Sequence, residues 1–171
     1  IKRFGFDVSR LPKNLSLALG SGEVTPLELV SGYAVLANGG YQINPYFIER
    51  IETEYGDVVM EADPARVCKN CDESDYDSDN EPVDIAAIIK LAQIGPGHAA
   101  SRTLDAGNAW IMNSMMRDVI RIGTGRRALQ LKRNDIAGKT GTTNEQKDAW
   151  FSGFNGEIAT AVWVGFDDSK P

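Results

Sequence analysis

Two runs of aromatic and β-branched residues near the end of the chain are separated by an Asn-Gly pair. The runs are Ala149 to Phe154 and Ile158 to Phe166, and Asn155-Gly156 lies between them. Such runs favour β-strands, and Asn-Gly between two of them is the strongest short signal for a β-hairpin. Ile136 to Thr143 precedes them as a short run of mixed polar and apolar residues, so the last third of the chain is predicted to be an antiparallel meander.

The segment from Thr25 predicts a helix with a well-defined start. Thr25 is suited to cap the helix, Pro26 fits its first position, and Glu28 completes a capping box. Gly39-Gly40 is expected to end it. A second helix is predicted from Asn108 to Ile122. Its apolar residues form one stripe that we interpret as core: Ile111, Met112, Met115, Met116, Val119 and Ile120. The expected fold class is α/β, an antiparallel sheet flanked by helices.

The middle of the chain is less regular. Tyr46 to Glu54 and Val58 to Ala62 are β-rich, and a hairpin turn is expected between them. Residues 63–84 contain few apolar side chains, so we expect a disordered acidic insertion there. Ile85 to Ile94 is apolar and fits either a helix or a strand.

Net charge and cysteine content exclude several functions. The chain has 171 residues and a net charge of −6, and the seven acidic residues between Asp72 and Asp84 account for all of it. The rest is nearly neutral, so no nucleic-acid partner is expected. Structural zinc usually needs four ligands, and the chain offers only Cys68, Cys71 and the single His98, so we expect no metal. The two cysteines are expected to form a small disulfide or to remain loop thiols. The chain begins Ile1-Lys2 without Met, and we interpret it as a fragment of a longer protein.

The segment that best indicates a functional site is Lys139-Thr140-Gly141-Thr142-Thr143. A phosphate loop is one interpretation of Gly138-Lys139-Thr140, but that motif needs glycine at position 133, where Arg133 stands. A polar edge strand without a role is the second interpretation, because a tripeptide recurs by chance. The third is the K-T-G element of penicillin-recognising serine enzymes.

Three longer segments favour the third interpretation. They are the stretch from Ile136 through Asp148-Ala149-Trp150 to Asp167, the helix segment Gly22 to Gly40, and Arg121-Ile122-Gly123-Thr124-Gly125-Arg126. Together they closely resemble class A penicillin-binding proteins, over nearly the whole chain except about residues 63–100. The resemblance implies the penicillin-binding transpeptidase fold, which serine β-lactamases share, with residues 1–171 as the C-terminal portion of one such domain.

The resemblance also implies a function and a set of roles. The parent would be a D,D-transpeptidase that cross-links peptidoglycan stem peptides ending in D-Ala-D-Ala through a serine acyl-enzyme, and β-lactams would inhibit it. Lys139 would supply a positive charge, and the hydroxyls of Thr140 and Thr142 would bind the substrate carboxylate. The Thr142 N–H would be one oxyanion donor. Gly141 would let the substrate backbone approach the strand closely, and Thr143 would complete the substrate-binding strand. The reaction would need no cofactor.

Two family motifs are missing from this chain. The nucleophile motif S-x-x-K does not occur, and its nearest match is Ser114-Met115-Met116-Arg117, where Arg cannot give up its proton. S-x-N occurs only as Ser78-Asp79-Asn80, inside the acidic run, which has no reason to be rigid.

We therefore expect the chain alone to be inactive and to need a companion chain with the other half of the domain. Members of the class also carry a glycosyltransferase domain and a membrane anchor, which would place the protein on the periplasmic face of the bacterial inner membrane. The alternative is a non-catalytic peptide- or partner-binding fragment.

Overall fold

The structure is a computed structural model that describes residues 1–67, 99–143, 147–166 and 168. Two compact units are present, one from residues 1–42 and 102–171 and the other from residues 43–101. The predicted insertion at 63–84, apart from its first residues, lies outside the described residues, as do the predicted element Ile85 to Ile94 and both cysteines. Within the described ranges no helix is long and apolar enough to cross a membrane.

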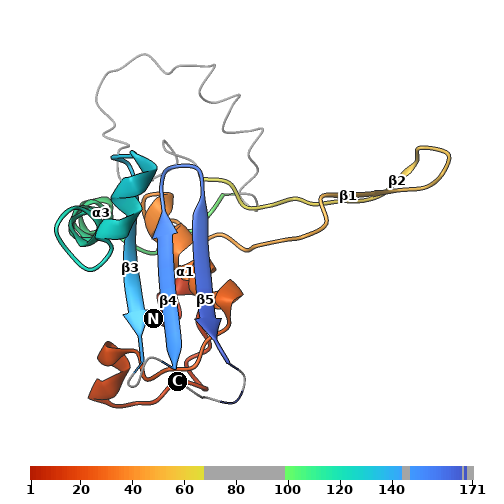
Figure 1. The fold of residues 1–171 in the computed structure, drawn as a ribbon. Helices are drawn as coiled ribbons and strands as arrows, with labels where there is room; N and C mark the ends of the chain where they lie inside the picture. The colour runs from red at the N-terminus through yellow and green to blue at the C-terminus, as the bar shows by residue number, and fades with distance from the viewer. Residues whose placement is uncertain (68–98, 144–146, 167, 169–171) are drawn as a thin grey trace, which may run out of the picture. The chain divides into compact units, whose positions relative to one another are not determined.

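The first unit is built around a three-stranded sheet. Its strands β3 (Ala137–Thr142), β4 (Asp148–Phe154) and β5 (Ala159–Gly165) are antiparallel and lie in the order β3-β4-β5 (Figure 1). The predicted meander is confirmed. In the turn between β4 and β5, the Asn155 side-chain oxygen accepts the N–H groups of Glu157 at 2.9 Å and Ile158 at 2.8 Å.

Helix α1 (Pro26–Ala37) begins at the predicted capping box. The Thr25 hydroxyl accepts the Glu28 N–H at 3.2 Å, and the Glu28 carboxylate accepts the Thr25 N–H at 2.8 Å. Two N–H groups that would otherwise lack a helical partner are satisfied in this way. The helix ends, as predicted, just before Gly39 and Gly40, which adopt φ values of 85° and 108°.

Helix α3 (Ala106–Arg121) confirms the second predicted helix, and Asp105 caps its start. The prediction of one core stripe is wrong for Ile111 and Met115, which are 49% and 53% exposed. Met112 and Met116 pack against the core instead, and Ile120 is fully buried. Residues four apart lie on one face of a helix, so the 112–116–120 row faces the core, together with the buried Ala109.

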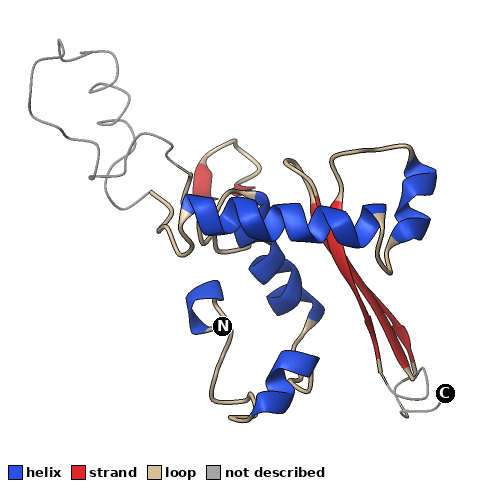
Figure 2. Ribbon diagram, turned by 90° about the vertical axis from the view of Figure 1, so that its left-hand side faces the viewer, coloured by secondary structure: helices blue, strands red, loops and turns tan. Residues whose placement is uncertain are grey.

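The core of the first unit lies where both helices meet the sheet. Leu36 of α1, Ala137 of β3 and Phe154 of β4 form its centre. Helix α1 contacts β4 and β5, and α3 contacts β3. In Figure 2, α3 runs past the start of β3. Tyr33 of α1 packs its ring 6.1 Å from that of Phe154. Burial raises the pKa of the Tyr33 phenol, and a hydrogen bond with Ser152 opposes this effect.

Short 3-10 helices complete the first unit: η1 (Lys2–Phe4), η2 (Leu15–Leu19) and η4 (Arg126–Leu131). The second unit contains the antiparallel hairpin of β1 (Arg50–Glu52) and β2 (Val58–Glu61). The Thr53 N–H donates to the Asp57 carbonyl oxygen at 2.9 Å across its turn, so the predicted hairpin is confirmed.

Candidate functional site

The Lys-Thr-Gly segment lies within an extended strand. Gly138, Lys139 and Thr140 pair in register with Gly153, Ser152 and Phe151 of β4. A phosphate loop instead wraps the phosphates with a turn that leads directly into a helix. Because β3 is continuous here, the phosphate-loop interpretation is excluded.

Consecutive side chains of β3 point to opposite faces of the sheet. Lys139 therefore projects on one face, and Thr140 and Thr142 project on the other. The ammonium of Lys139 is exposed and donates a hydrogen bond to the Thr140 carbonyl oxygen at 2.7 Å. The cation is thus held next to the strand backbone, within reach of a ligand on the strand edge.

The outer edge of β3 is open. Among the described residues, β3 pairs with β4 and with no other strand. The Thr143 N–H donates to the Asp148 carbonyl oxygen at 3.1 Å, so it points towards β4. N–H groups of consecutive residues in an antiparallel ladder point alternately to the two sides of the strand. The N–H group of Thr142 therefore points to the open edge.

The two threonine hydroxyls on β3 differ in their partners. The Thr140 hydroxyl lies 2.6 Å from the hydroxyl of Thr124, which follows α3. The exposed hydroxyl of Thr142 has no hydrogen-bond partner among the described residues. The sequence assigned no role to Thr124, although it lies in the Gly-Thr-Gly segment after the predicted helix.

Thr143 lies outside β3, and its hydroxyl has a local role. It accepts the Asp148 N–H at 2.8 Å and lies 3.5 Å from the Asp148 carboxylate. The other oxygen of that carboxylate accepts the indole N–H of Trp163 at 2.8 Å. This network joins the ends of β3 and β4 to β5, so the Thr143 side chain is engaged within the protein.

Packing within the chain does not require glycine at position 141. A Cβ added there would lie 3.2 Å from the Cβ of Trp150, a close contact that a small shift relieves. By contrast, a Cβ at Gly138 would lie 2.7 Å from the backbone oxygen of Ser152. The packing within the chain therefore explains a glycine at position 138 but not at position 141.

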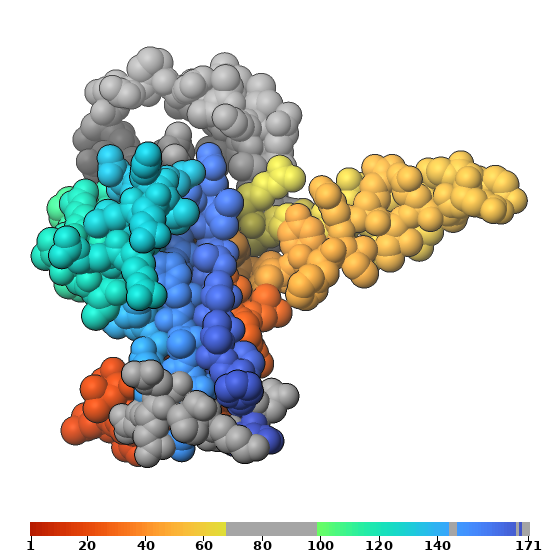
Figure 3. All heavy atoms as spheres, in the orientation of Figure 1, coloured from red at the N-terminus to blue at the C-terminus, as the bar shows by residue number. Residues whose placement is uncertain are grey.

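The face of the sheet that carries Thr140 and Thr142 is largely uncovered. Helix α1 packs against the opposite face, where Tyr33 meets Phe154. On the uncovered face, Val162 and Val164 of β5 are 50% and 66% exposed. Figure 3 shows the sheet residues, in blue, at the surface on the side turned to the viewer.

Among the residues that the structure describes, no activated serine lies at this strand. Ser114 is exposed on α3 and is followed by Met115-Met116-Arg117, and Ser78 lies outside the described residues. No group of three or more metal-ligating side chains is gathered in the part of the chain that the structure describes. The arrangement can therefore bind an extended, anionic ligand, but the described residues place no activated nucleophile beside it.

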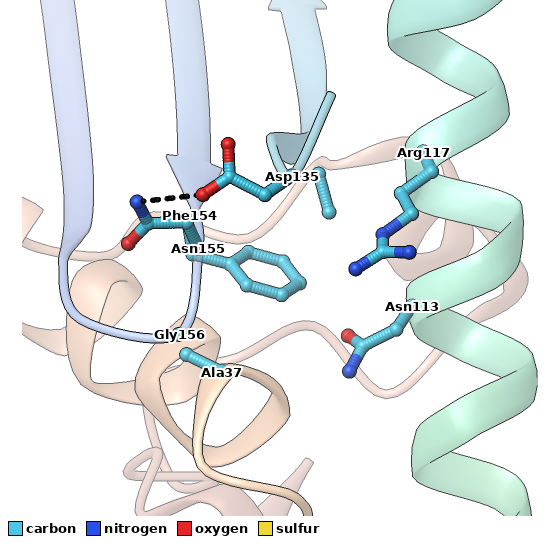
Figure 4. A pocket seen from close by; sticks show the side chains of 8 residues that line it. Ala37, Asn113, Arg117, Asp135, Phe154, Asn155 and Gly156 are labelled. Atoms are coloured by element: carbon cyan, nitrogen blue, oxygen red, sulfur yellow. Dashed lines mark hydrogen bonds between the residues drawn. The ribbon is translucent and has the colours of Figure 1, made fainter. Parts of the chain in front are cut away.

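A small pocket lies at the opposite end of β3 and contains none of the predicted site residues (Figure 4). Its volume is about 130 Å³, which suits a few water-sized groups. Asn113 lines it with a side-chain oxygen that is buried without a hydrogen-bond partner in the described structure. A hydrogen bond from Arg133 lowers the pKa of Asp135, which also lines the pocket, to about 2. The pocket is too small for a peptide.

Comparisons with known proteins agree with this geometry. Residues 9–169 match the model of the penicillin binding protein transpeptidase domain. The chain is 47% identical to penicillin-binding protein 1A of Pseudomonas aeruginosa over 99% of its length, and 44% identical to that of Neisseria lactamica. It covers only 23% and 18% of these relatives, so it spans about a fifth of their length.

Solved structures of penicillin-binding proteins share the fold of this chain. The crystal structure of penicillin-binding protein 1A from Haemophilus influenzae superposes with a TM-score of 0.80 and 35% identity, over 99% of this chain and 26% of that one. PonA1 from Mycobacterium tuberculosis in complex with penicillin V shares the fold, with a TM-score of 0.61, 22% identity, and coverage of 94% of this chain and 34% of that one. The family match over most of the chain confirms the resemblance: this chain belongs to the penicillin-binding protein transpeptidase domain family.

Proposed function

We propose that this chain supplies the substrate-binding K-T-G strand of a serine D,D-transpeptidase that cross-links peptidoglycan and is inhibited by β-lactams. One observation carries the proposal: the open edge of β3 presents the Thr142 N–H group, the Thr142 hydroxyl has no partner among the described residues, and the Lys139 ammonium is held at the Thr140 carbonyl oxygen. An extended peptide binds such an edge as an added strand.

The proposed substrate is a stem peptide that ends in D-Ala-D-Ala. Its terminal carboxylate would accept hydrogen bonds from the hydroxyls of Thr140 and Thr142, and Lys139 would supply a neutralising charge. The Thr142 N–H would donate to the oxygen of the reacting carbonyl, where negative charge develops in the transition state. β-Lactams that carry a carboxylate would use the same groups.

The nucleophile comes from another part of the full-length protein in this proposal. Its serine oxygen attacks the penultimate D-Ala carbonyl carbon, and the terminal D-Ala leaves with a proton on its amine. An amine of a neighbouring stem peptide then attacks the ester, forms the cross-link and releases the serine. The Lys139 to Thr142 strand binds and orients the donor in both steps.

Exposed apolar side chains support the need for a further part of the domain. Trp110 and Met115 of α3 are 71% and 53% exposed, and Val164 of β5 is 66% exposed. Apolar surfaces of this kind are normally covered in a folded enzyme. We propose that the remaining part of the domain covers them, and that the whole protein also carries a glycosyltransferase domain and works at the periplasmic face of the inner membrane.

The absence of S-x-x-K from the chain favours a second candidate, a non-catalytic fragment that binds peptides or a partner. Denaturing intact-mass spectrometry after incubation with benzylpenicillin separates the two. A penicilloyl adduct on the full-length protein, and none on this chain alone, is the result expected for a transpeptidase. If the full-length protein forms no adduct and binds D-Ala-D-Ala peptides reversibly, the binding fragment is the better account.

Replacing Gly141 by alanine in the full-length protein is expected to slow acylation by benzylpenicillin roughly tenfold. The added methyl group would obstruct a ligand on the β3 edge, at a steric cost of about 1.4 kcal/mol. Thermal unfolding should change little, because the methyl group meets only the Trp150 Cβ closely.

Gly138→Ala is the matched control, since its methyl group would collide with the Ser152 backbone oxygen. That variant should lose thermal stability, whereas Gly141→Ala should lose acylation at unchanged stability. Equal acylation rates for Gly141→Ala and the unsubstituted protein would remove Gly141 from the proposed binding strand.

A further inference from the structure

A hydroxyl pair joins β3 to the turn that follows α3. The Thr124 hydroxyl oxygen lies 2.6 Å from the Thr140 hydroxyl oxygen, and either atom has the geometry to donate. Thr140 is half-buried in β3, and Thr124 is exposed. This contact is the one side-chain hydrogen bond among the described residues that holds a hydroxyl of the Lys139 to Thr142 segment.

The turn that carries Thr124 is tightly fixed to its own helix. The N–H groups of Gly123 and Gly125 donate to the carbonyl oxygens of Asp118 at 3.0 Å and Val119 at 2.9 Å. A Cβ at Gly123 would lie 2.8 Å from the Val119 Cα, and one at Gly125 would lie 2.8 Å from the Ile120 side chain. The two glycines therefore let the backbone close against α3, and Thr124 between them is held in place.

A hydroxyl group has one hydrogen to donate and two lone pairs to accept with. If Thr140 donated to Thr124, its hydrogen would be unavailable to a ligand. If Thr124 donates to Thr140, the Thr140 hydrogen stays free for an anion. The hydrogen bond from Thr124 to Thr140 then polarises the Thr140 hydroxyl and strengthens its hydrogen bond to the anion. A ligand carboxylate therefore selects the arrangement in which Thr124 donates.

We propose that Thr124 is a positioning residue for carboxylate recognition: its hydroxyl donates to Thr140 and directs the Thr140 hydrogen towards the carboxylate of the bound donor peptide or β-lactam. The inference rests on the proposed function, because it concerns the same strand. It extends the site from β3 to the turn after α3. Thr124 acts only through Thr140.

A double-mutant cycle in the full-length protein tests the proposal, with benzylpenicillin as the probe. The variants are Thr124→Val, Thr140→Val, the double variant and Thr124→Ser. Stopped-flow kinetics separates the dissociation constant of the initial complex from the rate constant of acylation. Thermal unfolding of each variant provides the control for folding, since valine retains the shape of threonine.

Thr124→Val is expected to weaken the initial complex about fivefold, which corresponds to one hydrogen bond, with an unchanged unfolding temperature. Thr124→Ser should restore binding, because it restores the hydroxyl. In the Thr140→Val background, Thr124→Val should have no further effect, because the group that it positions is gone.

An equal loss from Thr124→Val in both backgrounds, or no loss at all, would overturn the inference while leaving the proposed function intact. A loss that Thr124→Ser does not restore would show that the turn acts through packing, and would also overturn it. If benzylpenicillin does not acylate the unsubstituted full-length protein, the proposed function fails first and the inference fails with it.

Discussion

Replacing Lys139 by alanine in the full-length protein is expected to lower the rate of acylation by benzylpenicillin about a hundredfold. A hydrogen bond to a charged group contributes up to about 3 kcal/mol, and each 1.4 kcal/mol corresponds to a factor of ten. The only partner of the ammonium in the described structure is the adjacent Thr140 carbonyl oxygen. The fold does not depend on this contact, so the variant should unfold at the same temperature as the unsubstituted protein.

Two further variants give this prediction its controls. Lys139→Arg keeps the positive charge but changes its shape, so it should retain part of the activity. Lys13→Ala removes an exposed lysine from the N-terminal segment and should leave acylation unchanged. Acylation of Lys139→Ala at the normal rate would exclude the proposed role of Lys139.

Replacing Gly40 by alanine is expected to destabilise the first unit by about 4 kcal/mol, which would lower its unfolding temperature by roughly 10 °C. Gly40 has a φ of 108°, and an added Cβ would collide with the backbone oxygen of Leu104. Its own carbonyl oxygen accepts the N–H groups of Thr103 at 2.7 Å and Leu104 at 3.0 Å. The segment before α3 therefore cannot move away without losing these hydrogen bonds.

Gly39→Ala is the matched control in the adjacent position. Gly39 also has a positive φ, 85°, but an added Cβ would meet no atom within 4 Å. Only the backbone strain of a left-handed alanine remains, about 1 kcal/mol. Thermal unfolding of both variants in the full-length protein checks the prediction, and similar shifts for the two would show that the Leu104 contact is unimportant.

Much of the fold is a local property and could be predicted from the sequence. The capping box at Thr25 and Glu28 places the start of α1, because these groups lie three residues apart on the chain. The aromatic and β-branched runs on either side of Asn155-Gly156 predict β4 and β5, because a strand pairs most readily with its neighbour across a tight turn.

The sequence predicted α3 correctly but assigned too many of its apolar residues to the core. Six apolar residues occupy a broad arc of the helix, whereas β3 and the residues around it cover only part of that arc. Met112 and Met116 pack against the core, and Ile111 and Met115 remain exposed. Periodicity gives the relative directions of side chains, but the position of the neighbouring element decides which of them are buried.

The sequence by itself determined that this protein has a meander of three strands, two helices, one of them with a capping box, and a Lys-Thr-Gly segment in the first strand. Only the tertiary structure decided that the Thr142 N–H points to an open edge, that the Thr143 hydroxyl is engaged with Asp148, and that Thr124 meets Thr140. The physical reason is the range of the interactions. Turns, caps and strand runs depend on residues a few positions apart, whereas the pairing of two hydroxyl groups 16 residues apart depends on how α3 packs against β3.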